Sequence, residues 1–238
     1  MTKTDIGKQR SSNQDAFFAV ELGKNTSLAI VCDGMGGANA GNIASQTAVK
    51  VISDYVMNSF SQKMDSESIE KMLSYAIESA NLQIYGMSLK NESLKGMGTT
   101  VVVAVLKGNT AIISHVGDSR AYKIGETAEQ LTRDHSVVQS LLESGKITPA
   151  DAKSHPKKNV ITRALGVEQD IVADTLITTL DEGESLLLCT DGLTGYVDIA
   201  QILKIIKSKK QENVAQELIN CANNAGGGDN ITVALLFR

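Results

Sequence analysis

Hydrophobic positions in the first third of the chain follow two different spacings. Apolar runs at 15–22 and 26–32 flank a Gly-Lys-Asn turn, and this pattern predicts a β-hairpin. In 40–60 and again in 66–89, apolar residues recur every three or four positions, which is the spacing of an amphipathic helix. We therefore expect a hairpin followed by a pair of helices.

Strand-type and helix-type spacings of hydrophobic residues also occur in the rest of the chain. Apolar, β-branched runs predict further strands at 99–106, 111–116, 120–124 and 184–190. Amphipathic stretches predict helices near 198–207 and 212–224, before a last strand at 231–237. Strands and helices come in blocks, which disfavours a doubly wound parallel sheet and favours an α+β fold. Several strands are apolar on both faces, so we expect two packed sheets with helices outside.

The segment 134–170 differs from the rest of the chain. Its apolar periodicity is weaker, and it holds both prolines. It predicts an exposed excursion over a site, with an ordinary surface loop as the equally supported alternative. Because no Pro-rich linker, low-complexity stretch or internal repeat divides the chain, we expect 1–238 to form a single domain.

Composition narrows the classes of function. Lys and Arg number 23 against 27 Asp and Glu, and this formal charge of −4 disfavours a nucleic-acid partner. The longest apolar run, 101–106, is far shorter than the ~20 residues of a membrane span, so no membrane partner is expected. The three cysteines lie far apart and the N-terminus lacks an apolar signal core, which together favour a reducing cytoplasm.

Aspartates stand at the ends of the predicted strands. They are Asp33, Asp118, Asp191 and Asp229, and a fifth, Asp15, opens the first strand. Asp33 and Asp191 are each followed directly by glycine. One Asp-Gly after a strand is usually only a turn, but four strand-end aspartates in one chain are hard to produce by turn chemistry alone.

Carboxylates that converge at strand ends need a counter-charge, because ionised carboxylates repel one another. Hard divalent cations bind oxygen ligands, and an adjacent glycine lets backbone carbonyls or waters approach closely. The pattern therefore predicts a two-metal hydrolytic site. Mg²⁺ or Mn²⁺ ions would lie about 3.5–4 Å apart, with a bridging water as the nucleophile.

Other chemistries are less well supported. Each of His115, His135 and His155 lacks a second His or a Cys at ligand spacing, so we expect ordinary polar or core histidines rather than a zinc site. The chain has neither a P-loop nor a G-x-S-x-G motif. Arg10 lies five residues before Asp15 and could grip a phosphate with its planar guanidinium, although a solvated surface arginine is the default.

Eight short motifs occur in order: RSSNQD at 10–15, VCDGMGG at 31–37, GTT at 98–100, HVGDSRAY at 115–122, LTRDHS at 131–136, ITRALG at 161–166, LCTDGL at 188–193 and GDNITV at 228–233. Together they resemble the metal-dependent Ser/Thr protein phosphatases of type 2C, in their bacterial form. The resemblance extends over nearly the whole chain. It implies an α-β-β-α sandwich of two antiparallel sheets flanked by helices, with a flap segment near 140–170.

The resemblance also implies a role for each candidate residue. The ligands of two metal ions would be Asp33, the carbonyl of Gly34, Asp191 and Asp229. Asp118 together with Asp191 would hold a third ion. Asp15 would orient metal-bound water, and Arg10 would bind the substrate phosphate.

The implied activity is metal-dependent hydrolysis of phosphoserine and phosphothreonine in proteins by a metal-activated water, with no phosphoenzyme. The implied partners are phosphorylated proteins and a cognate bacterial Ser/Thr kinase whose action the enzyme reverses in cytoplasmic signalling, and a monomer is expected. One position departs from the eukaryotic pattern. Met35 stands where many members carry a histidine proposed as the general acid, and residues 33–45 contain no histidine.

Two alternatives belong to other classes of function. One is a catalytically silent regulator related to the phosphatases, which the intact Asp33, Asp191 and Asp229 argue against. The other is a metal-dependent phosphatase of small phosphoesters. Activity toward phosphopeptides and its dependence on Mn²⁺ or Mg²⁺ would separate the three.

Overall fold

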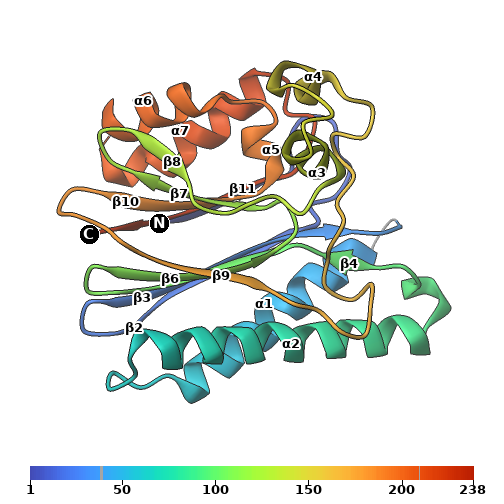
Figure 1. Ribbon diagram of the computed structural model, residues 1–238, viewed down its shortest axis with the longest axis horizontal. Coiled ribbons are helices and arrows are strands. Elements are labelled where there is room, and N and C mark those ends of the chain that lie inside the picture. Colours follow the sequence, from blue (N-terminus) through green and yellow to red (C-terminus); the bar gives the residue numbers. More distant parts are fainter. Residues whose placement is uncertain (38–39, 209) are drawn as a thin grey trace.

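Two antiparallel sheets stack face to face, and a layer of helices covers the outer face of each (Figure 1). The computed structural model describes residues 1–37, 40–208 and 210–238. Every strand pair in both sheets is antiparallel. The predicted α+β sandwich is therefore confirmed.

The first sheet has the strand order β2-β3-β5-β6-β9. Its strands are β2 (Asp15–Gly23), β3 (Thr26–Met35), β5 (Val101–Lys107), β6 (Thr110–Val116) and β9 (Asp174–Thr179), and β4 (Gly98–Thr99) pairs with the end of β3. Helices α1 (Ala40–Ser59) and α2 (Ser66–Lys90) cover its outer face, and the short helix η1 (Glu92–Leu94) follows α2.

The second sheet has the strand order β1-β11-β10-β7-β8. Its strands are β1 (Thr2–Asp5), β11 (Ile231–Phe237), β10 (Ser185–Cys189), β7 (Arg120–Ile124) and β8 (Ala128–Gln130). Helices α6 (Ile199–Ser208) and α7 (Gln211–Asn224) cover its outer face, and α5 (Asp191–Thr194) begins directly after β10.

Alternate residues of the central strands serve different parts of the core. On β3, Leu28 and Ile30 pack toward α1 and α2, whereas Ala29 and Val31 pack into the interface between the sheets. A third apolar cluster joins the second sheet to α6 and α7. One apolar cluster thus lies between the sheets and one lies under each helix layer. The strands β3, β5, β10 and β11 are apolar on both faces because both of their faces are covered.

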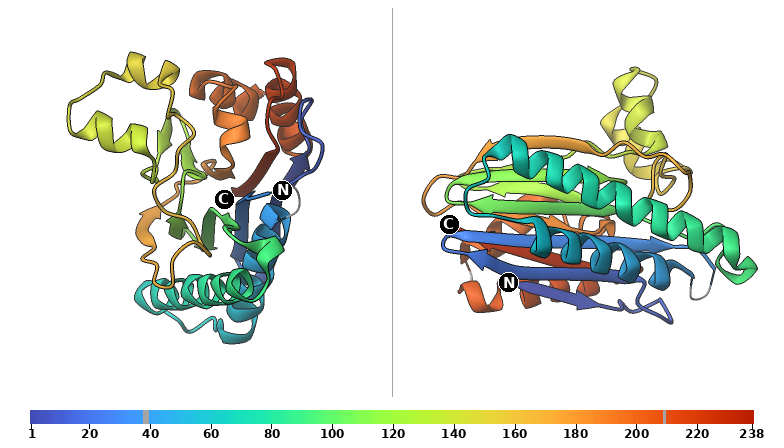
Figure 2. Two further views of the ribbon diagram at one scale, coloured as in Figure 1. Left: turned by 90° about the vertical axis from the view of Figure 1, so that its right-hand side faces the viewer. Right: turned by 90° about the horizontal axis from the view of Figure 1, so that it is seen from below.

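The segment between β8 and β9 projects from the sandwich (Figure 2). It contains two short helices, α3 (Val137–Glu143) and α4 (Pro149–Ser154). Thr148 caps α4 through a reciprocal capping box with Asp151, and Pro149 occupies the first helical turn. The expected excursion is thus a helical projection, while its role as a flap stays a prediction.

Within the described ranges, none of the helices is both long enough and apolar enough to cross a membrane.

A carboxylate cluster where the two sheets meet

The first sheet contributes two aspartates from neighbouring strands. Asp15 opens β2 and lies directly opposite Asp33 of β3 in the antiparallel register. Asp15 is buried, and Asp33 is partly buried. The hairpin predicted from the sequence therefore places two carboxyl groups side by side.

The second sheet brings two more aspartates to the same place. Asp191 follows β10, and Asp229 precedes β11, which pairs with β10. Thr190 and Thr232 lie between these aspartates and the first sheet, and their hydroxyls donate hydrogen bonds to Asp15 Oδ2 at 3.0 and 2.7 Å. Two threonine hydroxyls thus join the sheets at the site.

Asp118 reaches the cluster from the turn in which the chain crosses from β6 in one sheet to β7 in the other. Its neighbour Ser119 shares a hydrogen bond of 2.7 Å with the Thr100 hydroxyl. The same hydroxyl accepts a hydrogen bond of 3.0 Å from the backbone N–H of Asp33. This link fixes the turn that carries Asp118 relative to the strand that carries Asp33.

These carboxyl groups lie near one another, and Asp229 alone among the five forms an ion pair within the part of the chain that the structure describes. Burial, together with the neighbouring Asp191 and Asp229, raises the pKa of Asp15 to about 7, although the hydrogen bonds from the two threonine hydroxyls lower it. Burial and Asp191 also raise the pKa of Asp118 to about 7. Burial followed by the other carboxylates raises the pKa of Asp33 well above its usual range.

Two oxygens of the cluster are available as ligands. Asp15 Oδ1 and Asp191 Oδ1 are buried and have no hydrogen-bond partner in the part of the chain that the structure describes. Asp33 and Asp191 are close enough to share a hydrogen bond, which two ionised carboxylates cannot form. Hard oxygen donors, mutual repulsion and unpartnered atoms together fit a site for divalent cations of the Mg²⁺ or Mn²⁺ type.

Gly34 occupies a position that excludes any side chain. A Cβ there would lie 2.1 Å from the carbonyl oxygen of Gly41 and 2.6 Å from that of Gln14. The backbone N–H of Gly34 donates to the Gln14 carbonyl at 3.1 Å. The glycine after Asp33 therefore lets β3, the start of α1 and the chain entering β2 meet beside the cluster.

Arg10 lies at the edge of the cluster and is half exposed. Its Nη2 donates to Asp229 Oδ2 at 2.8 Å, and its Nε donates to the Gly228 carbonyl at 3.3 Å. The other Asp229 oxygen accepts the backbone N–H of Asn230 at 2.8 Å. Arg10 is thus anchored to the chain that carries Asp229 and remains half exposed.

The structure also brings together a group that spacing along the chain did not reveal. Ligand atoms of His115, His135 and Asp174 lie within 4.8 Å of one another. However, the backbone N–H of Gly117 donates to His135 Nδ1 at 3.1 Å, so the neutral ring carries its proton on Nε2. This Nε2 faces Asp174 Oδ2 at 3.3 Å, and a metal ion there would have to displace the proton.

Both of these histidines are buried and neutral. Burial lowers the pKa of His115 to about 4, and it also lowers the pKa of His135. Their rings stack with centroids 4.7 Å apart. The arrangement agrees with the expectation of core histidines. His155 lies on the projecting segment and is partly exposed.

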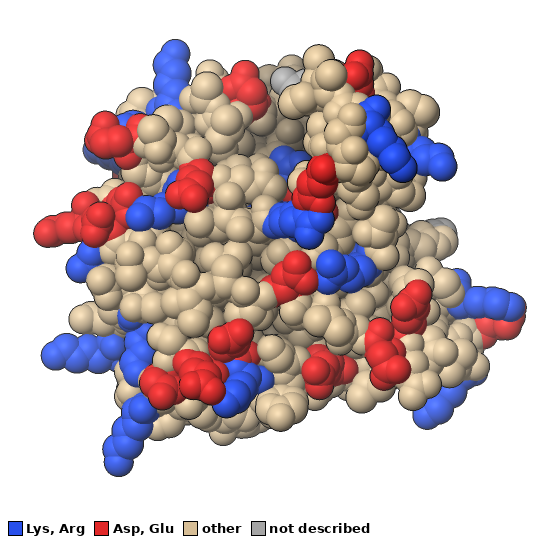
Figure 3. Space-filling model, viewed as in Figure 1, with Lys and Arg blue, Asp and Glu red and all other residues tan. Residues whose placement is uncertain are grey.

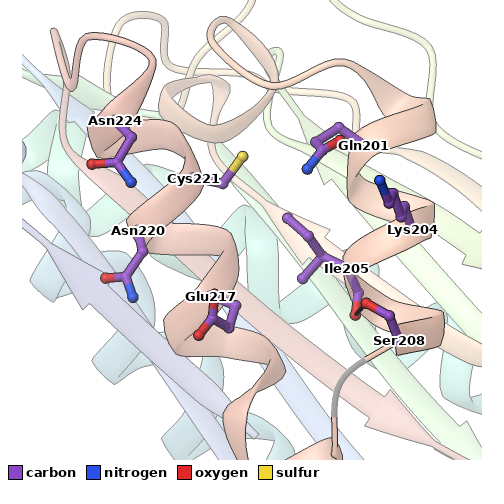
Figure 4. Close-up of a pocket in the computed structure, with 8 residues that line it drawn as sticks. All are labelled: Gln201, Lys204, Ile205, Ser208, Glu217, Asn220, Cys221 and Asn224. Atoms are coloured by element: carbon purple, nitrogen blue, oxygen red, sulfur yellow. Dashed lines mark hydrogen bonds between the residues drawn. The ribbon is translucent and has the colours of Figure 1, made fainter.

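Two other surface features lie apart from the cluster. Figure 3 shows acidic and basic side chains interspersed on one face, without a basic stripe. Figure 4 shows a groove between α6 and α7, on the outer helix layer, into which Cys221 points and beside which Gln201 and Lys204 lie. Since the groove contains none of the five clustered aspartates, it is not part of the candidate site.

Comparison with known proteins agrees with this geometry. Residues 6–231 match the family model for protein phosphatase 2C, and the chain belongs to that family. The serine/threonine phosphatase stp of Listeria welshimeri is 41% identical over 238 residues, which cover 99% of this chain and 94% of the relative.

Solved structures support the same assignment. The serine/threonine phosphatase of S. agalactiae superposes with a TM-score of 0.91 at 38% identity, covering 99% of this chain and 97% of that one. The catalytic domain of the phosphatase PstP, solved in complex with two manganese ions, gives a TM-score of 0.87 at 30% identity over 99% of this chain and 95% of that one. The predicted family and enzyme class, a serine/threonine protein phosphatase, are confirmed.

Proposed function

We propose that this chain removes phosphate from phosphoserine and phosphothreonine in proteins, in a Mn²⁺- or Mg²⁺-dependent reaction at the aspartate cluster. The observation that carries the proposal is the clustering of five carboxyl groups, four of which have pKa values raised chiefly by burial, with two oxygens that have no hydrogen-bond partner among the described residues. Relatives that bear the name serine/threonine phosphatase support the substrate class.

Seven residues would share the work. Two ions would be held by Asp33, the Gly34 carbonyl, Asp191 and Asp229, and a third by Asp118 together with Asp191. When bound, such ions act as Lewis acids toward phosphoryl oxygens and lower the pKa of a coordinated water. The two manganese ions in the PstP structure support the number two for the core site.

Asp15 is suited to orient the attacking water. Thr190 and Thr232 occupy its Oδ2, which leaves Oδ1 as the free acceptor of the same carboxylate. A water that donates to Oδ1 would be held with its lone pair turned away from Asp15. The two hydroxyls therefore leave Oδ1 as the oxygen of Asp15 that can bind the attacking water.

Arg10 is suited to bind the phosphoryl group. A planar guanidinium can donate two parallel hydrogen bonds to phosphate oxygens, and half of the Arg10 side chain is exposed. Its contact with Asp229 holds the group at the edge of the cluster before substrate arrives. Because Met35 has no proton to give, the serine or threonine leaving group takes its proton from water or from a site carboxyl.

The finer parts of the proposal concern the cellular setting. We place the enzyme in the cytoplasm as a monomer that opposes a cognate Ser/Thr kinase in signalling. The three reduced, widely spaced cysteines support a reducing compartment. Residues 1–238 would form a single catalytic domain. The projecting segment that carries α3 and α4 would be its flap.

The direct test measures phosphate release from a phosphothreonine peptide and from p-nitrophenyl phosphate, with Mn²⁺, with Mg²⁺ and with EDTA. We expect both substrates to be hydrolysed with metal and neither with EDTA. Activity that survives EDTA would refute the metal mechanism. Turnover of the small ester alone would support the small-phosphoester alternative, and no turnover of either would support the silent regulator.

A further inference from the structure

The turn that carries Asp118 has little regular structure of its own. Gly117 adopts a φ of +105°, and a Cβ on it would lie 2.6 Å from the Thr100 side chain. The chain passes here from one sheet to the other, so the strand ladders do not fix the turn. The orientation of Asp118 therefore depends on contacts from elsewhere in the chain.

His135 supplies two of these contacts, on both sides of the Gly117 peptide. The backbone N–H of His135 donates to the Gly117 carbonyl at 2.9 Å. The backbone N–H of Gly117 donates to His135 Nδ1 at 3.1 Å. His135 is 4% exposed, so neither bond competes with bulk water.

The imidazole ring has close neighbours at its other edge and on one face. Nε2 faces Asp174 Oδ2 at 3.3 Å, and the other oxygen of Asp174 accepts a hydrogen bond from Arg163 at 2.7 Å. His115 stacks on the ring, and His115 pairs with Asp174 across β6 and β9. The core of the first sheet thus fixes the acceptor that Gly117 uses.

The backbone of His135 is fixed as well. Its carbonyl accepts a hydrogen bond from the N–H of Thr162 at 2.8 Å, and the next residue, Ser136, forms a β-bridge with Ile161. These contacts close the base of the projecting segment. Both the main chain and the ring of His135 are therefore placed by other parts of the fold, and both bond to Gly117.

We propose that His135 is a positioning residue that holds Asp118 in place for the third metal ion. The inference rests on the proposed role of Asp118 and adds the residue that sets its geometry. His135 contacts the turn rather than the ion or the substrate. His135 bonds to the residue before the proposed ligand, and loss of a contact that orients a metal ligand typically weakens metal binding about 10- to 100-fold.

Two substitutions of His135 separate its two ring contacts. In His135→Asn, the side-chain oxygen can take the place of Nδ1 and accept the Gly117 N–H. In His135→Gln, the longer side chain puts its amide where Nε2 lies, next to Asp174, and leaves no acceptor beside the Gly117 N–H. Both variants are neutral and polar, so they differ mainly in which of the two ring contacts survives.

The experiment is Mn²⁺ titration of metal-stripped full-length protein by calorimetry, with Asp118→Asn identifying the site that depends on Asp118. We expect His135→Gln to weaken that site about 10- to 100-fold and leave the remaining Mn²⁺ sites unchanged. We expect His135→Asn to retain the wild-type affinity. Circular dichroism of each variant confirms the fold.

Three outcomes would overturn the proposal: wild-type affinity in His135→Gln, an equal loss in His135→Asn, or a wild-type titration of Asp118→Asn. If His135→Gln does not fold, the smaller His135→Ala, which also removes the acceptor beside Gly117, takes its place, and unchanged Mn²⁺ affinity there would overturn the proposal. Asp33→Asn, assayed on the phosphothreonine peptide, tests the proposed function separately. Retained turnover in that variant would refute the function, whatever the His135 result.

Discussion

Asp118→Asn should stabilise the metal-free protein even though it removes a proposed metal ligand. Burial and Asp191 raise the pKa of Asp118 from 3.8 to about 7. Between these two values the folded protein binds more protons than the unfolded chain, so stability falls as the pH rises through this window. Above pH 7 the cost of the ionised Asp118 reaches about 4 kcal/mol, which is the ceiling of the gain expected from the variant.

The assay is urea unfolding in EDTA at pH 8 and at pH 4. We expect the free energy of unfolding of Asp118→Asn to exceed that of the wild type at pH 8, with the difference shrinking toward zero at pH 4. Asp170→Asn changes an exposed carboxyl and is the matched control, expected to stay within about 0.5 kcal/mol. Equal stability of Asp118→Asn and wild type at pH 8 would refute the reasoning, as would an equal gain at both pH values.

Mn²⁺ should act on the stabilities of the wild type and Asp118→Asn in the opposite direction. A ligand that binds only the folded state stabilises it in proportion to the logarithm of its concentration over its dissociation constant. The wild type should therefore gain more from saturating Mn²⁺ than Asp118→Asn does. A smaller gain in the wild type would contradict the assignment of Asp118 as a ligand.

Four further predictions concern other residues. Asp191→Ala should abolish phosphate release while circular dichroism stays native, and retained turnover would contradict its assignment as a ligand. Arg10→Ala should mainly raise KM, because phosphate is bound in the ground and transition states alike, and an unchanged KM with a normal rate would return Arg10 to a surface role. Thr232→Val removes a hydrogen bond to Asp15 and should lower kcat about 10-fold, which steady-state kinetics can check. Burial lowers the pKa of His115 from 6.5 to about 4, so this site binds more protons in the unfolded chain between these values, and the contribution of His115 to stability should fall by about 3 kcal/mol as the pH drops from 6.5 to 4. The difference in stability between the wild type and His115→Gln, measured by thermal unfolding at both pH values, should change by about that amount, and a difference that is the same at both pH values would contradict the reasoning.

The sequence predicts the central strands and the long helices α1, α2, α6 and α7 well because their burial is simple. Residues 101–106 and 231–237 are apolar on both faces, and the structure covers both faces of β5 and β11. The edge strands β1, β8 and β9 carry no such signal. β9 is a partly exposed edge strand rich in threonine, and only its pairing with β6 reveals it.

The candidate site follows from strand ends, whereas its supporting contacts do not. The sequence predicts Asp33 and Asp191 as site residues because each follows an apolar strand and precedes a glycine. Thr190 and Thr232 adjoin the same motifs but gave no signal, since a buried threonine in a strand needs no further explanation. His135 and Asp174 are distant along the chain, and only the packing of 134–136 against β6 and β9 brings them together.

The most direct measurement of the central claim is the anomalous difference map of a crystal soaked in Mn²⁺. We expect two strong peaks among Asp33, Asp191 and Asp229, and a weaker third beside Asp118. A map without density among these aspartates, or with its only peak between His115 and His135, would contradict it.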